Sequence, residues 1–229
     1  MNDTLLEDAI TNNVALCEAV LAAHGVRGAT TGGWWCAQQR VPPYYSNLIT
    51  RVPGDSRQLY EAIESVDLAA PWFIKDSFAC LKLETRGFRS LFDAQWYGCA
   101  AGHLASPVAP RFERIGAGQA LARWEETWQR TSPAPGMRIF PATILEDTGL
   151  EFYRLGDAGG AILKLSRGAV GISNVFPRDA ELHREVVRLA ASLHPGLAIV
   201  GYGNHDDVLP LGLRPLGPLR VWQRVGQNQ

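Results

Sequence analysis

Two stretches of this 229-residue chain carry the same landmarks in the same order. Each begins with a Ser-Asn pair in an apolar strand, then reaches a proline, a helix and a second short apolar strand. Each continues into a Gly-Phe/Leu-Arg-x-Leu segment and ends at a tryptophan. Gly87 follows Ser46 by 41 residues, and Gly212 follows Ser173 by 39 residues. We therefore predict an internal repeat of strand, helix, strand, short helix and strand.

The expected elements differ at the start of the two halves. From residue 137 the pattern changes to the strands RIFPATIL, LEFYRLGD and GGAILKLSRGAVGISNVF, which predicts a meander of antiparallel hairpins. The first half has little room for such strands, because we interpret its GATTGGWWC segment as a plain loop. Trp34 and Trp35 in that segment either line a pocket or divide between the core and its rim.

Helical spacing predicts a long first helix over residues 4–23, stopped by Gly25, and a later helix over residues 121–130. The helix of the first repeat is expected over residues 55–66, capped by Asp55. The Ala-, Gly- and Pro-rich residues between the halves suit a linker. We therefore expect two domains, a shorter half at 1–105 and a more complete half at 106–229.

Composition narrows the class of protein. The hydrophobic fraction of 46%, the charged fraction of 20% and the net charge of -1 are ordinary for a globular chain and offer nothing to attract nucleic acid or an acidic membrane surface. No apolar run reaches membrane-spanning length, and the acidic start MNDTLLEDAI is unlike a signal peptide. These features predict a cytoplasmic protein with no nucleic-acid or membrane partner.

The four cysteines match no zinc-binding spacing. We expect them to be reduced and structural. A nucleophilic role for Cys36 or Cys99 stays open, although no adjacent histidine supports it.

The junction after the second central strand is the first candidate for a binding site. The strand at 170–176 runs into Pro177 and Arg178, and a helix follows at once. Helix starts of this kind often hold phosphates through their free N–H groups and the positive end of the helix dipole. Such sites usually contain glycines, yet none lies between Gly171 and Gly196.

Residues 137–224 resemble the GCN5-related N-acetyltransferases (GNAT). In that family antiparallel strands lead into a central strand, followed by a helix, a fifth strand, a helix that ends in Gly-Phe and a closing hairpin. The segments GAVGISNVFP, LAIVGY and GLRPLGPLRVW keep this order. The resemblance implies an α/β fold with a mixed, mostly antiparallel sheet flanked by helices and two pseudo-symmetric halves, with residues 44–98 as a truncated second copy.

The resemblance also implies where acetyl-CoA, or another acyl-CoA, would bind as co-substrate. In the family, the free backbone groups of the central strand pair with the pantetheine arm, and here that segment is Ile172, Ser173, Asn174 and Val175. The family's diphosphate loop is rich in glycine, but its glycine positions fall near Glu181 and His183. The motif is therefore degenerate, with Arg178 as partial compensation.

General acid–base groups are also scarce by comparison with the family. The family's tyrosine acid would correspond to Leu83 or Val208. Tyr202 and His205 are the candidate catalytic residues, because both side chains suit proton transfer. The alternative is a structural turn in which Asn204 caps a short helix and His205 is solvated.

These features predict an acyl-CoA-dependent N-acetyltransferase that requires no metal and acts on an unidentified amine, either a small molecule or a peptide N-terminus. The alternative is a non-catalytic protein of the same fold that binds or regulates through a ligand. Association as a homodimer is left open.

Overall fold

The computed structural model describes residues 2–65, 72–104, 111–130, 138–157 and 159–225. Four α-helices lie among them: α1 (Asn2–Ala22), α2 (Arg57–Glu64), α3 (Gly118–Arg130) and α4 (Ala180–Leu193). The strands are β1 (Gly28–Thr31), β2 (Trp34–Ala37), β3 (Leu48–Thr50), β4 (Phe73–Asp76), β5 (Phe88–Cys99), β6 (Glu113–Arg114), β7 (Leu150–Leu155), β8 (Gly159–Ser166), β9 (Ala169–Phe176), β10 (Ala198–Gly203) and β11 (Arg214–Arg224). Short 3-10 helices are η1 (Glu84–Arg86), η2 (Ala142–Glu146), η3 (His205–Asp207) and η4 (Leu209–Leu211).

The described strands form one continuous sheet in the order β1-β2-β3-β4-β11-β5-β10-β9-β8-β7-β6. Within it, β3 pairs with β4 and β9 pairs with β10 in parallel, and the other pairings are antiparallel. The predicted fold class, a mixed and mostly antiparallel sheet flanked by helices, is confirmed. The closing segment RPLGPLRVWQR, for which a strand or a hairpin was expected, is one long strand, β11.

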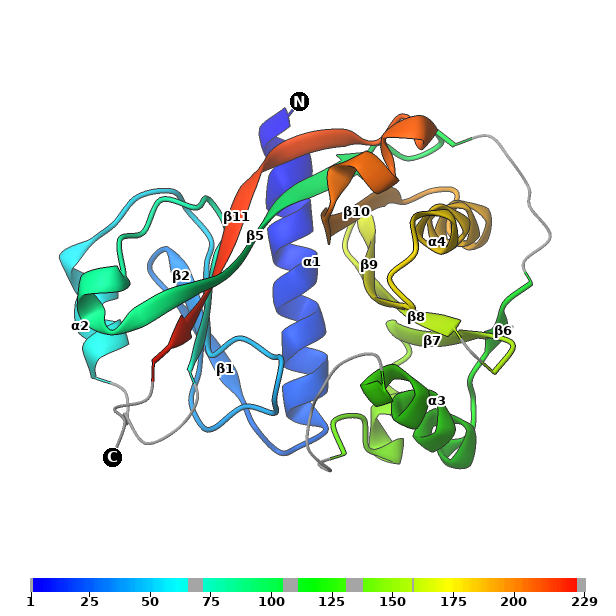
Figure 1. The fold of residues 1–229 in the computed structure, drawn as a ribbon, viewed down its shortest axis with the longest axis horizontal. Coiled ribbons are helices and arrows are strands. Elements are labelled where there is room, and N and C mark those ends of the chain that lie inside the picture. The colour runs from blue at the N-terminus through cyan, green and yellow to red at the C-terminus, as the bar shows by residue number, and fades with distance from the viewer. Residues whose placement is uncertain (1, 66–71, 105–110, 131–137, 158, 226–229) are drawn as a thin grey trace.

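Apart from the edge strand β6, the strand order is symmetric about the neighbouring long strands β11 and β5, which cross in the view of Figure 1. Each is the last strand of one half, and each pairs with the other half: β11 lies beside β4, and β5 lies beside β10. Gly87 and Gly212 end the preceding 3-10 helices with φ of 78° and 76°, a conformation that favours glycine. The β5–β11 register then skips Leu91 on one strand and Leu216 on the other, so both strands carry a bulge at the same landmark.

The Ser-Asn landmark does not share this symmetry. Asn47 precedes the first parallel pair, Leu48 with Ile74, whereas Ser173 follows the last parallel pair, Ile172 with Gly201. The structural equivalent of Ile172 is instead Leu48, because their partners Gly201 and Ile74 pair with equivalent residues of β5 and β11. The matching Ser-Asn spacing in the sequence was therefore a coincidence of composition, about three residues out of register.

One predicted loop forms a hairpin. Residues 28–37 fold into β1 and β2, which are joined by Gly32 and Gly33. The φ of 57° at Gly32 suits such a two-residue turn. The tryptophans that follow are both buried, and they belong to different core clusters on opposite faces of the sheet. The first half therefore has leading hairpin strands after all, and both tryptophans are core residues.

Two further local predictions are wrong. The RIFPATIL segment is not a strand, because the buried carboxylate of Glu125 accepts the backbone N–H groups of Ile139 and Phe140 and the chain then enters η2. The cap of α2 is Ser56, whose hydroxyl accepts the Leu59 N–H at 3.1 Å, and not Asp55. The C-terminal end of this predicted helix, at residue 66, lies outside the described residues.

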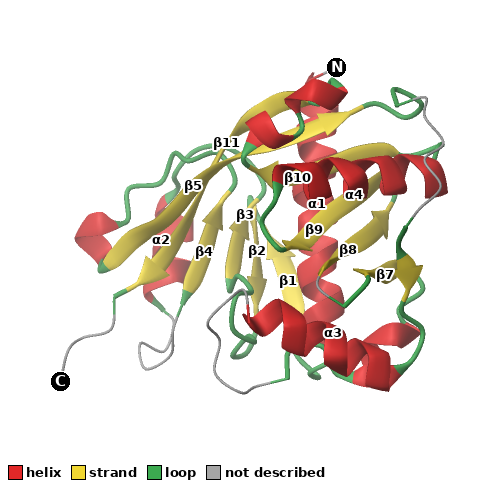
Figure 2. Cartoon of the chain, turned by 45° about the vertical axis from the view of Figure 1, so that its right-hand side comes forward, coloured by secondary structure: helices red, strands yellow, loops and turns green. Residues whose placement is uncertain are grey.

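The first helix has the predicted buried face, made by Ile10, Val14, Cys17 and Leu21. It runs behind the crossing strands in Figure 1, and Figure 2 shows α4 on the opposite side of the sheet. The contact between α1 and β9 is close enough that a Cβ on Gly171 would lie 1.8 Å from the Asn12 Oδ1. The helix is held there by the Asn12 amide, which donates to the Lys164 carbonyl and the Ser166 hydroxyl, both at 2.8 Å.

In the part of the chain that is described, no helix is long and apolar enough to cross a bilayer. The predicted domain boundary at 105/106 lies outside the described residues, and the strand exchange at β5 and β11 links the two halves into one sheet.

Candidate functional site

The parallel strands β9 and β10 separate part-way along their length. Their pairing runs from Ala169–Ala198 to Ile172–Gly201 and stops there, although β9 continues to Phe176. The pairing on the other side of β9, with β8, continues past this point to Phe176. From Ser173 to Phe176 the β10-facing edge of β9 is therefore free of strand pairing. Ser173, Asn174 and Val175 of the segment that the resemblance implied lie on this edge, whereas Ile172 is still paired with Gly201.

A bulge at Asn174 accompanies this separation. Asn174 has a φ of 52°, and the β8–β9 register shifts at the same place. Positive φ is uncommon for residues other than glycine and is best tolerated by Asn and Asp. The Ser173 hydroxyl donates to the Asn174 Oδ1 at 2.7 Å within the same strand. The bulge turns the strand edge at the point where a ligand would enter.

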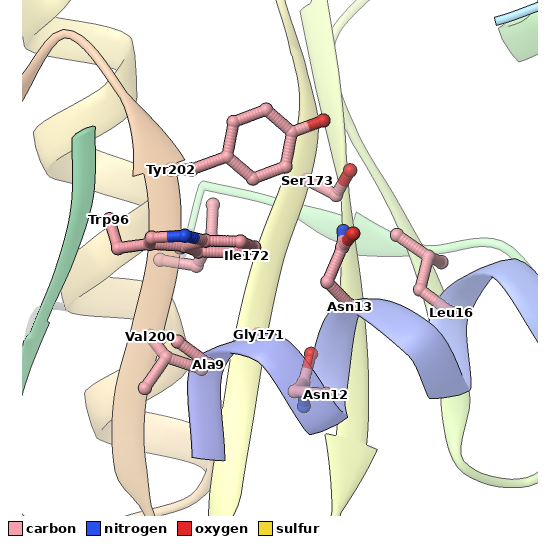
Figure 3. A pocket seen from close by; sticks show the side chains of 11 residues that line it. Ala9, Asn12, Asn13, Leu16, Trp96, Gly171, Ile172, Ser173, Val200 and Tyr202 are labelled. Atoms are coloured by element: carbon pink, nitrogen blue, oxygen red, sulfur yellow. The ribbon is translucent and has the colours of Figure 1, made fainter. Parts of the chain in front are cut away.

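A pocket lies at this separation, on the face covered by α1 (Figure 3). Its empty space is about 240 Å³, part of which is open to solvent. It is lined by Ala9, Asn12, Asn13, Leu16, Trp96, Gly171, Ile172, Ser173, Val200, Gly201 and Tyr202. In Figure 3 Tyr202 and Ser173 lie at one end and Asn12 and Val200 at the other. Helix α1 and strands β5, β9 and β10 thus all contribute to one site.

Tyr202 lies one residue beyond the last β9–β10 pair, so its ring reaches the pocket from the separating strand. Its ring packs edge-on against Trp96, with 5.3 Å between centroids. The Lys75 ammonium lies 4.1 Å from the centroid of the same ring. Among the described residues, no group hydrogen-bonds the Tyr202 hydroxyl, which is therefore available to a ligand.

Lys75, on β4 of the first half, is buried against two residues that line the pocket, Asn13 and Tyr202. It is 5% exposed, and its ammonium donates to the Asn13 Oδ1 at 2.7 Å. Because an ammonium can only donate, the oxygen of the Asn13 amide must face Lys75 and the NH2 group must face away from it. Lys75 and Asn13 were not predicted from the sequence. The sequence signal that could have pointed to Lys75 was a lysine inside the short predicted strand WFIKD.

The other candidate residues lie outside this pocket. His205 is in η3, and its Nε2 lies 2.9 Å from the Leu213 carbonyl, where it ties the turn to the start of β11. Asn204 caps η3 as predicted, accepting the Asp206 N–H at 3.3 Å. Arg178 is exposed between Pro177 and the start of α4.

The N-terminus of α4 is already capped by a carboxylate. The Asp179 side chain accepts the Leu182 N–H at 2.8 Å, and Glu181 follows in the first turn. A carboxylate at this position competes with an anionic ligand for the free N–H groups and repels it. The acidic cap that we had expected in the first half is therefore found in the second.

His183 fills the space beside this helix start. Its Nε2 lies 2.6 Å from the hydroxyl of the fully buried Tyr97, and its Nδ1 lies 3.8 Å from the Asp207 carboxylate. Burial lowers the pKa of His183 below its usual value, although Asp207 opposes that shift. Burial also raises the pKa of Tyr97 far above its usual range. These three side chains lock α4 against β5 and η3 on the face opposite the pocket.

The cysteine thiols and the acidic and histidine side chains do not form a further reactive site among the described residues. Burial raises the pKa of the Cys17, Cys36 and Cys99 thiols, which disfavours the nucleophilic thiolate. In the described part of the chain, no group of three or more His, Cys, Asp or Glu side chains is arranged to hold a metal ion.

Comparison of the whole structure with solved structures identifies the architecture. A GCN5-related N-acetyltransferase from Kribbella flavida superposes with a TM-score of 0.59 over 96% of both chains, at 13% sequence identity. The chain has the GNAT fold. A protein named for the GNAT family from Novosphingobium aromaticivorans superposes at a TM-score of 0.55 over 86% of this chain and 91% of its own, at 13% identity.

The GNAT fold is also shared with a protein of unknown function from Staphylococcus epidermidis, at a TM-score of 0.57 and 10% identity over 88% of this chain and 95% of that one. No family model and no curated protein matches the sequence. At such identities the likeness concerns the GNAT fold alone, so function must come from the site.

Proposed function

We propose that this protein transfers an acyl group from an acyl-CoA to an amine. The observation that carries the proposal is the separation of β9 from β10 after Ile172 and Gly201, which leaves a strand edge with free backbone groups beside a pocket. Among folds that bind thioesters, such an edge can align an extended pantetheine arm by backbone hydrogen bonds, as an added strand would. The GNAT-fold neighbours that are named acetyltransferases support the same reaction class.

The residues present fit two parts of an acyl-CoA differently. The β9 edge at Ser173, Asn174 and Val175 fits the pantetheine arm, since it offers backbone donors and acceptors without side-chain demands. The start of α4 does not fit the family's glycine-lined diphosphate loop, because Asp179 caps it. Arg178 is the residue that we assign to the phosphates, with its exposed guanidinium ahead of the helix.

The chemistry that these residues supply is positioning more than proton transfer. The reaction breaks the thioester C–S bond, forms an amide C–N bond and moves a proton from the amine to the departing sulfur. A backbone N–H of the bulged β9 segment would polarise the acyl carbonyl, and the pocket would hold the amine against it. Tyr202 is the side chain placed to exchange a proton there, since its hydroxyl has no partner among the described residues.

His205 is the second candidate acid or base, and the geometry favours Tyr202 over it. The His205 ring is engaged with the Leu213 carbonyl and does not line the pocket. Replacing Tyr202 by Phe should therefore lower the rate of transfer more than replacing His205 by Ala. Both losses should stay below about a hundredfold if catalysis rests on positioning, since general acid–base assistance alone is typically worth about 10²–10⁴-fold.

The test is calorimetry with acetyl-CoA and longer acyl-CoAs, followed by single-turnover transfer to a panel of amines between pH 6 and 9. We expect micromolar or tighter binding of at least one acyl-CoA and amide formation with at least one amine. Absence of both would refute the proposed activity and leave a ligand-binding or regulatory protein of the same fold. A thousandfold loss of transfer in the Tyr202→Phe variant, with donor binding intact, would show that a dedicated acid exists.

We further propose that the two halves are copies of one GNAT-type unit and that the first is truncated. Their strand order and the paired bulges at Leu91 and Leu216 support common ancestry. The first copy is shorter in both elements that build a donor site: β3 has 3 residues where β9 has 8, and α2 has 8 where α4 has 14.

A further inference from the structure

We propose that the pocket beneath α1 recognises a carboxylate, so that the acceptor of the acyl group is an amino acid or another small amine that carries one. The inference deepens the proposed function, and rests on it for treating this pocket as the acceptor site. The recognition itself is a property of Lys75, Asn13 and Tyr202, whatever reaction follows.

The first step is the charge of Lys75. Its ammonium is buried, and among the described residues it forms no ion pair with a carboxylate. Its contacts are neutral, the Asn13 Oδ1 at 2.7 Å and the Tyr202 ring at 4.1 Å. A buried charge without a counter-charge is costly, and an anion bound nearby would compensate it.

The nearest acidic residue in sequence is engaged elsewhere. Asp76 follows Lys75 on β4, and successive side chains of a strand point to opposite faces. The Asp76 carboxylate accepts the backbone N–H groups of Leu81 at 2.8 Å and Phe78 at 3.3 Å in the next turn. It therefore stabilises that turn, and the positive charge on the α1 face is left for a ligand.

The second step is the orientation of Asn13. Lys75 fixes the amide so that its NH2 group faces away from the ammonium, and no described group accepts a hydrogen bond from that NH2. Asn13 lines the pocket, as does the Tyr202 hydroxyl, which is also without a partner. Two side chains thus offer unused N–H and O–H donors in front of a buried cation. This is the arrangement that a carboxylate, with two accepting oxygens, requires.

The third step is size. The enclosed part has room for little more than a water molecule, and the wider space of about 240 Å³ includes open solvent. Ala9, Leu16 and Val200 contribute apolar wall to it. The pocket therefore suits one small anionic group, with the rest of a ligand in its open mouth.

The experiment compares matched ligands that differ only at the carboxylate. Glycine, alanine and leucine are each set against their primary amides and against methylamine, ethylamine and isopentylamine, which lack the group. Binding is measured by saturation-transfer NMR and calorimetry on the full chain without acyl-CoA, and transfer is measured separately. We expect each acid to bind at least about tenfold more tightly than its amide, since hydrogen bonds to charged groups are worth that much.

Two variants abolish the unpaired positive charge of Lys75 in different ways. Lys75→Met deletes it with similar volume, a change that buried charges often tolerate. Asn13→Asp keeps the lysine and supplies an internal counter-charge, so it serves even where the first variant fails to fold. Both should reduce the preference for the acid to about twofold or less. Lys82→Met, at an exposed lysine, is the control for net charge and should leave the preference unchanged.

The outcomes separate this inference from the proposed activity. A preference for the acid that vanishes in both variants supports carboxylate recognition, even if no amine is acylated and the acyltransferase proposal fails. Equal binding of acid and amide by the wild type, binding of none of the probes, or a preference that survives both variants overturns the inference. Acyl transfer to amines with no preference for the acid would leave the activity standing and remove carboxylate recognition.

Discussion

The parallel strand pairs β3–β4 and β9–β10 occupy equivalent places in the two halves, yet only one is open to a ligand. In the first, the Thr50 hydroxyl follows the last strand pair and accepts the N–H of Ser77, the residue just after β4, at 2.8 Å. In the second, Ser173 also follows the last strand pair, but it donates its hydroxyl to Asn174 in its own strand. The Thr50 hydroxyl thus ties the end of β3 to the chain just after β4, whereas the Ser173 hydroxyl makes no such link between β9 and β10.

The residue after the last parallel pair also differs between β4 and β10. Asp76, the first β4 residue beyond the last parallel pair, uses its carboxylate to close the turn after β4, whereas Tyr202, the first β10 residue beyond its last parallel pair, presents a free hydroxyl to the pocket. Two halves with the same strand order therefore offer two potential sites, and we expect the polar side chains at the separation to decide which one holds a ligand. The closed half still contributes to the open one, because Lys75 comes from β4.

The largest effect should be a loss of stability when a side chain is added to β9 of the second half at Gly171. Gly171 is the equivalent of Asn47, and even an alanine Cβ at Gly171 would overlap the Asn12 Oδ1. Gly171→Ala should displace that amide from its two hydrogen bonds and lower the free energy of unfolding by about 2–4 kcal/mol. Thermal and denaturant unfolding measure this. Gly196→Ala, where nothing lies within 4 Å, is the control and should change stability by less than about 0.5 kcal/mol. Equal stability of the two variants would mean that α1 is not seated on Gly171.

The second effect concerns the helix starts of the two halves. Arg178→Glu should weaken acetyl-CoA binding by about a hundredfold or more, because it places a second carboxylate beside Asp179. The matched change at the start of α2 is Arg57→Glu, and it should leave binding unchanged. Calorimetry with acetyl-CoA measures both. Loss of affinity in the Arg57 variant instead would move the donor site to the first half.

The third effect tests the hydroxyl that closes the first half. Thr50→Val keeps the shape but leaves the buried Ser77 N–H without its partner, which should cost about 1–3 kcal/mol of stability. Ser173→Ala removes a hydrogen bond within one strand and should cost less than about 1 kcal/mol. Chemical denaturation of both variants makes the comparison. If Ser173→Ala proves the more damaging, the second junction is not open in the way described.

The smallest effect is a pH dependence confined to the second half. His183 has a lowered pKa in the folded protein, so the unfolded chain binds more protons in the window just below the ordinary histidine value. Stability should therefore rise with pH through that window, and it should be lost as the pH falls below about 6.5. The equivalent residue of α2 is Tyr60, which does not titrate there. Unfolding from pH 5 to 8 should show a flatter profile for His183→Gln, and an unchanged slope would assign the dependence to another group.

Much of the fold could be predicted from the sequence, because the periodic patterns and caps are local. The long first helix, the meander before β9, the helix after it and the Gly-Phe/Leu landmarks all follow from spacing or from a glycine conformation. The β1–β2 hairpin was missed because a Gly-Gly turn also suits a loop. The RIFPATIL segment was misassigned because Glu125, a distant residue, captures its N–H groups.

The site was harder to predict. The place where β9 and β10 part could be predicted because a family resemblance pointed to the segment Ile172–Val175, and Tyr202 was chosen because it lies near the end of the neighbouring strand. Lys75 and Asn13 could not be found in this way, because they come from a strand of the other half and from the first helix. Their proximity depends on how β4, β10 and α1 assemble, and no local pattern records that.

The exchange of β5 and β11 sets the order in which a newly made chain can complete its structure. During synthesis β4 emerges early, but its neighbour on one side is β11, the last strand of the chain. That edge of β4 therefore stays unpaired until β11 has left the ribosome, and unpaired edges invite contact with other chains. Lys75 sits on that strand, so the candidate pocket acquires its buried cation only when the C-terminal residues arrive.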